Sequence, residues 1–200
     1  MRYIKFQDTS LRDGEQTPRL AYSLENKIEL TEALIELGMD SIEIGFPAAS
    51  KEEENIIKKI SSKYKNSSTE LVVFSRAIKR DIEIAYNSIK KVNNKKIQIV
   101  APVSDLHILH STNENKVSLL HNVEKSITYA RNNFTNIQFT AQDAPRADIE
   151  FLKEVVVIAI ENGATTICLP DTTGFSLPHQ YGKLIKIIKE VASNYENITL

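Results

Sequence analysis

Apolar runs and amphipathic segments alternate along the chain with a period of about thirty residues, which is the spacing of βα units. The short apolar or alternating runs predict strands at Tyr3–Asp8, Ser41–Phe46, Glu70–Ser75, Ile97–Pro102, Asn136–Ala141 and Thr165–Pro170. Residues 197–200 have the pattern of a further strand that is just beginning. The whole pattern predicts an α/β protein.

Helix-period apolar positions predict helices between several of these strands. The predicted buried stripes are Leu30, Ala33, Leu34 and Leu37; Ile56, Ile57 and Ile60, after a capping box at Ser50–Glu53; and Phe151, Leu152, Val155, Val156, Ala159 and Ile160. Gly38 and Gly163 follow the first and third stripes, where glycine closes a helix in the left-handed conformation. This repeated helix–glycine–strand joint predicts parallel strands with right-handed crossovers.

Polar residues follow every predicted strand, among them Asp13, Arg76, Ser104, Asp143 and Asp171. A barrel gathers all its strand ends around one mouth, whereas an open doubly wound sheet has its site at one switch point. No Gly-x-Gly-x-x-Gly follows a predicted strand, so the signal of a dinucleotide fold is missing. The pattern therefore favours a (β/α)8 TIM barrel.

Counting the units shows that the barrel is incomplete. We predict that residues 1–200 form one catalytic barrel domain, truncated to about six of the eight βα units and the start of the seventh strand. Either the chain is a fragment or the missing strands come from another chain. Because an unclosed parallel sheet has two unpaired edges, we expect poor solubility or self-association.

Composition narrows the classes of partner. The chain has 200 residues, is 42% hydrophobic and 26% charged, and carries a formal charge of −1, values typical of a globular protein. We therefore expect no nucleic acid and no membrane as partner. No signal peptide is visible, and the single cysteine, Cys168, allows no disulfide within the chain. These features indicate a cytoplasmic protein, with Cys168 as a buried structural thiol.

Candidate chemistry is concentrated in the turn after the first strand. Residues 8–16 are Asp-Thr-Ser-Leu-Arg-Asp-Gly-Glu-Gln, and most of these side chains can ionise or hydrogen-bond. Gly14 allows the backbone to turn sharply. A solvated loop would explain the charges equally well, so the turn alone does not decide between binding chemistry and a plain surface.

Five motifs in order carry a resemblance that covers essentially the whole chain. They are residues 8–16, Ile42-Glu43-Ile44-Gly45-Phe46-Pro47-Ala48-Ala49-Ser50, Ser75-Arg76-Ala77, Gln142-Asp143-Ala144-Pro145-Arg146 and Leu169-Pro170-Asp171-Thr172-Thr173-Gly174. With these motifs the chain resembles the 2-isopropylmalate synthase and homocitrate synthase family, relatives of hydroxymethylglutaryl-CoA lyase. Its second and fifth motifs are most similar to those of 2-isopropylmalate synthases.

The resemblance implies a metal-dependent TIM-barrel acyltransferase that condenses acetyl-CoA with 2-oxoisovalerate in leucine biosynthesis. It implies that Asp13 binds a divalent cation (Mg²⁺, Mn²⁺ or Zn²⁺) and that Arg12 stabilises charge developing on the keto oxygen. It further implies substrate-binding positions at Gln16, Gln98, Thr140, Gln142 and Thr172. It implies a homodimer, whereas the count of βα units leaves a complementary barrel fragment as the other expected partner.

Glu43 is the second catalytic candidate. It points the same way as Gly45, into the barrel, if Ile42 and Ile44 face the helices. An interior carboxylate needs a cationic partner, and Arg12 is the natural one. The alternatives are a purely structural buried ion pair for Glu43 and a loop cap for Thr172.

Several departures from the family pattern keep other interpretations open. The family completes its metal site with a His-x-His pair in the seventh strand, and His107, His110, His121 and His179 do not replace that pair, so we expect them on the surface. Gln98 stands where many members carry His, Thr140 where Ser is usual, and Gln142 where Glu is usual. Since Gln142 cannot ionise, any acid–base or electrostatic role of a carboxylate at this position is lost. The missing His pair and Gln142 together lead us to expect that the isolated chain is inactive.

Homocitrate or citramalate synthase activity, which differs only in the oxo acid, remains an alternative within this class. A retro-aldol lyase fits less well, because Gly45-Phe46-Pro47 resembles the synthases. A sugar-phosphate enzyme is disfavoured by the lack of a glycine-rich phosphate loop. An inactive fragment that needs a complementary chain is the alternative from another class.

Overall fold

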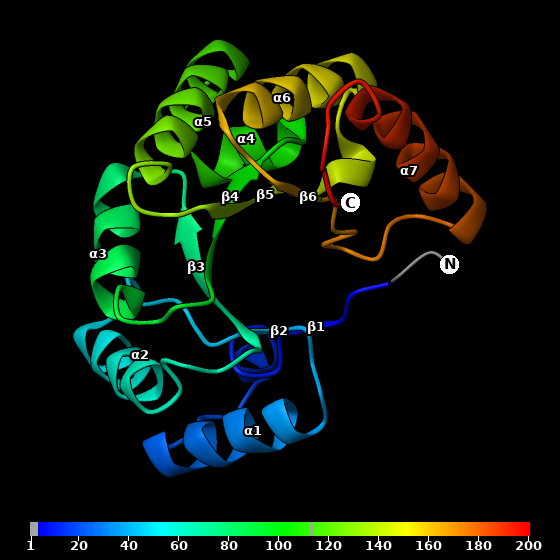
Figure 1. The fold of residues 1–200 in the computed structure, drawn as a ribbon. Helices are drawn as coiled ribbons and strands as arrows, with labels where there is room; N and C mark the ends of the chain where they lie inside the picture. The colour runs from blue at the N-terminus through cyan, green and yellow to red at the C-terminus, as the bar shows by residue number, and fades with distance from the viewer. Residues whose placement is uncertain (1–3, 113) are drawn as a thin grey trace. The chain divides into compact units, whose positions relative to one another are not determined.

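The computed structural model describes residues 4–112 and 114–200 (Figure 1). The chain forms two compact units, one made of residues 1–75 and 80–97 and the other of residues 76–79 and 98–200. Each unit is built from parallel strands and the helices that connect them.

The first unit begins with strand β1 (Gln7–Asp8), a 3-10 turn η1 (Gly14–Gln16) and helix α1 (Leu24–Glu36). It continues through β2 (Ser41–Glu43), α2 (Lys51–Lys63), β3 (Glu70–Arg76) and α3 (Lys79–Ile89). β1 pairs with β2 and β2 with β3, both in parallel, and Ser41 lies opposite Gln7 on one side and Glu70 on the other.

The second unit contains most of β4 (Lys95–Pro102), then α4 (Asp105–Ser111), α5 (Lys116–Ala130) and β5 (Asn136–Gln142). The 3-10 turn η2 (Ala144–Arg146), α6 (Ile149–Asn162), β6 (Thr166–Cys168) and α7 (Pro178–Ala192) follow. β5 and β6 pair in parallel. Thr199 forms a parallel bridge with Thr166, which confirms that a further strand position begins near the end of the chain.

The order of the strands in the sheet decides between the two candidate architectures. The order is β1-β2-β3-β4-β5-β6, the same as the order along the chain. A doubly wound sheet reverses its order at a switch point, whereas a barrel adds each new strand beside the last. The predicted βα-barrel fold, represented here by six strands, is confirmed.

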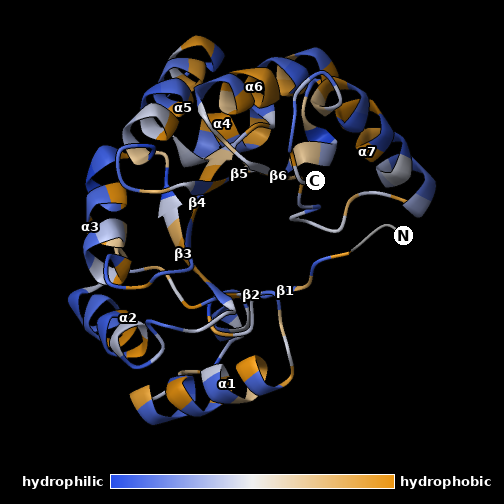
Figure 2. Ribbon diagram, viewed as in Figure 1, coloured by the Kyte–Doolittle hydropathy of each residue, from blue (hydrophilic) through white to orange (hydrophobic). Residues whose placement is uncertain are grey.

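Apolar side chains fill the space between the strands and the helices in each unit. In Figure 2 hydrophobic residues dominate α6, which packs on β5 and α5. The predicted stripe of α6 is buried in full, and Ile57 and Ile60 of α2 are completely buried, with Ile56 half-buried. The core of the first unit includes Ile42, Ile44, Leu71, Val73, Ile82 and Ile89.

The first two strands are shorter than predicted. Tyr3 lies outside the described residues, and Ile4 and Phe6 are 69% and 64% exposed, so the strand prediction for this segment holds only at Gln7–Asp8. β2 spans only Ser41–Glu43, although hydrogen bonds to β3 continue through Ile44 and Gly45, where φ is +142°. β6 likewise spans only Thr166–Cys168.

The predicted buried stripe of α1 is confirmed only in part, because Leu30 and Leu34 are half-buried. Leu37 is 70% exposed and Ala33 is exposed, whereas the buried residues of this helix are Lys27 and Thr31. Lys27 and Thr31 lie on the same helix face as Leu30 and Leu34. The ammonium group of Lys27 binds two carboxylates on that face, so its buried centre is polar rather than apolar.

The helix ends are partly as predicted. Gly38 and Gly163 have φ values of +81° and +118°, so both close their helices in the left-handed region. Ser50 caps α2 by accepting a hydrogen bond from the Glu53 N–H, at 3.0 Å. The predicted reciprocal half of this capping box is wrong, because the Glu53 carboxylate accepts from Lys27 instead.

The structure can also be compared with the expectations for Cys168 and for membrane-spanning helices. Cys168 forms no disulfide and is half-buried rather than fully buried. None of the helices within the described residues combines the length and the apolarity that a membrane crossing requires.

The turn between α6 and β6 allows a test of the claim that glycine is needed where φ is left-handed. We predict that Gly163→Ala lowers the free energy of unfolding by about 1 kcal/mol or more, because a Cβ would need the left-handed region and would meet Arg131. Gly182→Ala is the control: Gly182 lies inside α7 with open space around it, so alanine should stabilise by about 0.5–1 kcal/mol. Denaturant titration of both variants measures the difference, and equal effects would contradict the account.

Candidate active site

The turn after β1 presents Arg12 toward the buried end of β2. Arg12 Nε donates to Glu43 Oε1 at 2.8 Å and Arg12 Nη2 donates to Glu43 Oε2 at 3.0 Å. The pair is therefore bidentate, which is the strongest geometry for an arginine–carboxylate contact. The predicted partnership between these two residues is confirmed.

Burial governs the electrostatics of this pair. The Glu43 side chain is completely buried, and burial raises its pKa above the ordinary value even though the hydrogen bonds and charge of Arg12 act in the opposite direction. The Arg12 side chain is 18% exposed, and its guanidinium lies 5.0 Å from the centre of the Phe74 ring. Phe74 in turn packs edge-on against Phe46. The guanidinium is thus held by a buried anion and an aromatic face.

Asp13 is the solvent-facing member of the group. Its side chain is 60% exposed, and its Oδ1 accepts a hydrogen bond from Arg12 Nη1 at 2.8 Å. Carboxylate oxygens suit divalent cations, so Asp13 fits as one metal ligand. Residues 4–112 and 114–200 contain no group of three or more His, Cys, Asp or Glu that could hold a metal ion. Catalytic sites take about three protein ligands, so the ligand role of Asp13 stays a prediction.

The turn that carries Arg12 and Asp13 is fixed by its own backbone. The carbonyl oxygen of Thr9 accepts hydrogen bonds from the N–H groups of Arg12, Asp13 and Gly14, at 3.1, 2.8 and 3.2 Å. Gln16 ends the following 3-10 turn and is exposed. Glu15 does not face solvent freely, because it binds Lys27.

In the second unit, a buried amide links two predicted substrate-binding residues. Gln138 Nε2 donates to Gln98 Oε1 at 2.9 Å and to Thr140 Oγ1 at 3.3 Å. All three side chains are 4–5% exposed. Gln98 and Thr140 are therefore brought together through a residue that the motifs did not single out.

Gln142 is the last residue of β5, and Thr172 lies in the loop after β6. Gln142 is half-buried, and its carbonyl oxygen accepts from the Val103 N–H at 3.0 Å. Thr172 is exposed, and its Oγ1 accepts from the backbone N–H of Asp143 at 3.0 Å. A hydroxyl that accepts in this way keeps its own hydrogen for a second partner. Thr172 ties its loop to the end of β5, so the loop-cap interpretation remains open beside the substrate-binding one.

Asp143 is the centre of a buried cluster. Arg146 Nε lies 2.9 Å from both carboxylate oxygens of Asp143, and Ser104 donates to Oδ2. Asp143 is fully buried and adopts a left-handed φ of +64°. Burial alone would raise its pKa, but the hydrogen bonds from Arg146 and Ser104 outweigh it and hold the pKa below the ordinary value.

Most of the histidines lie on the surface, as predicted. His110, His121 and His179 are exposed. His107 differs: its side chain is 24% exposed, and its Nδ1, which has no hydrogen-bond partner among the described residues, is buried 3.7 Å from Asp143 Oδ2. It lies in α4, a helix that the apolar pattern did not predict.

Sequence reasoning missed Lys27, Phe74, Gln138 and the Asp143–Arg146 pair. One signal was available for Gln138, because it precedes Thr140 by two residues and so shares its face of the strand. A second was the spacing of Lys27 and Thr31, two polar residues four apart on one helix face. No pattern in the sequence marks Phe74 as a partner of Arg12.

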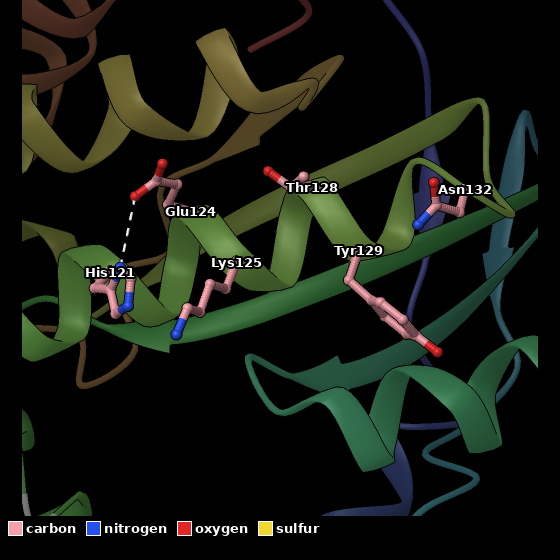
Figure 3. Close-up of a pocket in the computed structure, with 6 residues that line it drawn as sticks. All are labelled: His121, Glu124, Lys125, Thr128, Tyr129 and Asn132. Carbon is pink, nitrogen blue, oxygen red and sulfur yellow. Dashed lines mark ion pairs between the residues drawn. The ribbon is translucent and has the colours of Figure 1, made fainter.

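A shallow pocket of about 430 Å³ runs along α5 and is separate from these residues. Figure 3 shows its lining, all from α5 and its end: His121, Glu124, Lys125, Thr128, Tyr129 and Asn132. His121 Nδ1 lies 3.7 Å from Glu124 Oε2, and both side chains are more than half exposed. A depression on one face of a single helix carries no chemistry that the motifs would need.

Comparison with known proteins decides the family. The HMGL-like family model matches residues 3–200. The chain belongs to the HMGL-like family. The resemblance inferred from the five motifs is thereby confirmed.

Several curated relatives are 2-isopropylmalate synthases. The 2-isopropylmalate synthase of Oceanobacillus iheyensis is 38% identical over 200 residues, which cover 100% of this chain and 38% of the relative. That of Brevibacillus brevis is 36% identical over 200 residues, 100% of this chain and 39% of the relative. 2-Isopropylmalate synthase 1 of Caldanaerobacter subterraneus is 36% identical over 199 residues, 100% of this chain and 49% of the relative. The chain thus spans less than half the length of these relatives.

Solved structures show the same fold. The HMG-CoA lyase of Bacillus subtilis has a TM-score of 0.80 at 18% identity, with 99% of this chain and 67% of that chain covered. The lyase of Acinetobacter baumannii, in complex with coenzyme A and 3-methylmalate, has a TM-score of 0.74 at 20% identity, with 96% and 63% covered. At this identity the likeness establishes the fold alone.

The buried Asp143 predicts a pH-dependent stability. Because its pKa is lower in the folded protein than the unfolded value of about 3.9, its contribution is present above that value and is lost as pH falls through the folded pKa. We expect Asp143→Asn to cost about 3 kcal/mol at pH 7, since Arg146 loses its charged partner, and the cost to shrink below about pH 4.

Asp105→Asn is the matched control, because Asp105 is 74% exposed and pairs with Lys116 at the surface. Its effect should stay within about 1 kcal/mol at every pH. Urea titrations of the three proteins between pH 3 and 7 measure the difference. A cost of Asp143→Asn that does not change with pH would contradict the assignment.

Proposed function

We propose that the chain is the N-terminal part of the catalytic barrel of a 2-isopropylmalate synthase-like acyltransferase. The reaction is the Claisen condensation of acetyl-CoA with 2-oxoisovalerate in leucine biosynthesis, in the cytoplasm. The support is the 38% identity to a 2-isopropylmalate synthase over all 200 residues, together with the group formed by Arg12, Glu43 and Asp13.

The contacts of Arg12 are the observation that carries the proposal. A guanidinium has five N–H donors. In the contacts described above, Nε and Nη2 each give one to Glu43 and Nη1 gives one to Asp13, which leaves two for a substrate oxygen. Attack of an acetyl enolate on a 2-oxo acid places negative charge on the keto oxygen, and a cation oriented in advance lowers that barrier. Arg12 is the residue assigned to this role.

Glu43 acts on the reaction through Arg12. Because it is buried and bidentate, it fixes the plane of the guanidinium, while one N–H of Nη1 and one of Nη2 stay available. We assign Asp13 as one ligand of a divalent cation, Mg²⁺, Mn²⁺ or Zn²⁺, which when bound would act as a Lewis acid toward the oxo acid. The exposure of the Asp13 carboxylate is compatible with this assignment.

The other predicted substrate-binding residues keep that role as proposals, each within its own unit. In the second unit, Thr172 would donate its hydroxyl hydrogen to a substrate carboxylate, while its oxygen accepts from Asp143. Gln98 and Thr140, with Gln138 between them, would also contact substrate there. In the first unit, Gln16 would contact substrate from the exposed turn. Gln142 can bind but cannot exchange a proton, so acid–base chemistry at this position is not part of the proposal.

The isolated 200-residue chain is proposed to be inactive. The described residues supply one candidate metal ligand, and Gln142 stands where an ionisable side chain is usual in the family. Residues 1–200 would then work as an incomplete barrel domain, either within a homodimer of a longer protein or with a complementary barrel fragment. Homocitrate and citramalate synthase activities remain alternatives that differ in the oxo acid.

A chimera tests the proposal. Residues 1–200 replace the matching region of the Oceanobacillus iheyensis 2-isopropylmalate synthase, and release of CoA is measured with 2-oxoisovalerate, 2-oxoglutarate and pyruvate. We expect Mg²⁺- or Mn²⁺-dependent turnover that is fastest with 2-oxoisovalerate and is abolished by EDTA. Arg12→Ala should lower kcat by about 10²–10³-fold, and Arg80→Ala, at an exposed arginine of α3, should leave it unchanged.

Two further proteins, a Gln142→Glu chimera and the isolated chain, complete the test. A Gln142→Glu chimera restores an ionisable group and should raise kcat, and the isolated chain should release no CoA. Folded chimeras that turn over none of the three oxo acids, with or without Gln142→Glu, would overturn the proposal. Turnover that survives Arg12→Ala would overturn the role of Arg12, and turnover by the isolated chain would overturn its proposed inactivity.

A further inference from the structure

A completely buried lysine, Lys27, binds residues that follow Arg12 and Glu43 closely in sequence. The Lys27 side chain has no exposed surface, and its Nζ lies 2.7 Å from Glu15 Oε2 and 3.0 and 2.8 Å from the two carboxylate oxygens of Glu53. The three residues come from α1, the turn η1 and the first turn of α2. One ammonium group therefore joins three segments that are far apart in sequence.

Lys27, Glu15 and Glu53 are called the Lys27 cluster below. Its first arm, the ion pair between Lys27 and Glu15, reaches the turn that carries Arg12. Glu15 follows Arg12 by three residues and Asp13 by two. Its Oε1 also accepts a hydrogen bond from the Tyr22 N–H at 3.1 Å, so the carboxylate is held from two sides. The internal hydrogen bonds of the turn determine its shape, and Glu15 fixes that shape to the helices beneath it.

The second arm, the ion pair between Lys27 and Glu53, reaches the loop that follows Glu43. The Glu53 carboxylate accepts a hydrogen bond from the backbone N–H of Phe46 and lies directly against Gly45, where an added Cβ would be 2.1 Å from Oε1. Gly45 is two residues beyond Glu43. Only glycine permits this close approach, because its φ is +142° as well. Glu53 thus fixes the exit from β2.

We propose that Lys27 is a positioning residue for the Arg12–Glu43 pair: its ammonium group ties the turn of Arg12 and the loop after Glu43 into one fixed geometry. This inference rests on the proposed role of Arg12 in stabilising the keto oxygen. Lys27 touches neither Arg12 nor substrate in this account. It acts through Glu15 and Glu53, whose two negative charges would otherwise repel each other and draw in water.

The test observes Arg12 directly and needs no substrate. In the full 200-residue chain labelled with ¹⁵N, the Arg12 Nε–Hε signal is assigned from its loss in Arg12→Lys, and its hydrogen exchange with water is measured. Lys27→Met keeps the buried methylene groups and removes the charge. We expect the Arg12 Hε to exchange at least tenfold faster in Lys27→Met than in the unchanged protein.

Lys63→Met is the matched control. Lys63 of α2 pairs with Glu32 of α1 at 3.1 Å, so it links the same two helices, but its side chain is 45% exposed and it lies outside the cluster. It should leave the Arg12 signal unchanged. A folded Lys27→Met protein whose Arg12 Hε exchanges as in the unchanged protein would overturn the proposal, even if its thermal unfolding temperature falls.

A second variant keeps the proposal testable if Lys27→Met does not fold. Glu15→Leu removes only the arm to the Arg12 turn and retains the contact between Lys27 and Glu53. We expect faster Arg12 Hε exchange in this variant too, and unchanged exchange would overturn the proposal. Because no turnover is measured, an inactive chimera would leave these results standing, so failure of the proposed function and failure of this inference are distinguishable.

Discussion

The burial of one carboxylate, that of Glu43, constrains the whole first unit. A buried anion is costly unless a cation and hydrogen bonds compensate it, and here the compensation is the bidentate contact from Arg12. Arg12 can make this contact only if the turn after β1 stays folded against the end of β2. The Thr9 carbonyl, the Phe74 ring and the Lys27 cluster each contribute to that arrangement. The same geometry leaves guanidinium donors for a substrate oxygen.

Sequence patterns predicted the parts of the fold that depend on local chemistry. The α/β alternation, the parallel strands and the glycine joints at Gly38 and Gly163 all follow from side-chain period and backbone conformation. The Arg12–Glu43 pair was also predictable, because an inward carboxylate needs a cation and one stood at the neighbouring strand end. These inferences need only one strand or one pair of neighbours at a time.

The remaining features depend on contacts between segments that are distant in sequence. The buried centre of α1 was missed because it is Lys27, whose partners Glu15 and Glu53 are 12 and 26 residues away along the chain. Glu53 could not be recognised as anything but half of a capping box, since its sequence neighbours satisfy that pattern. Gln138 joins Gln98 across 40 residues, and no local period indicates such a contact.

The coupling between Arg12 and Glu43 is the most direct measure of the central claim. A double-mutant cycle with Arg12→Met, Glu43→Met and the double variant gives that coupling from the three changes in the free energy of unfolding. The account predicts that the double variant is less destabilised than the sum of the single variants by about 2 kcal/mol or more, because each single change leaves a buried or half-buried charge without its partner. Additive effects, within about 0.5 kcal/mol, would contradict it.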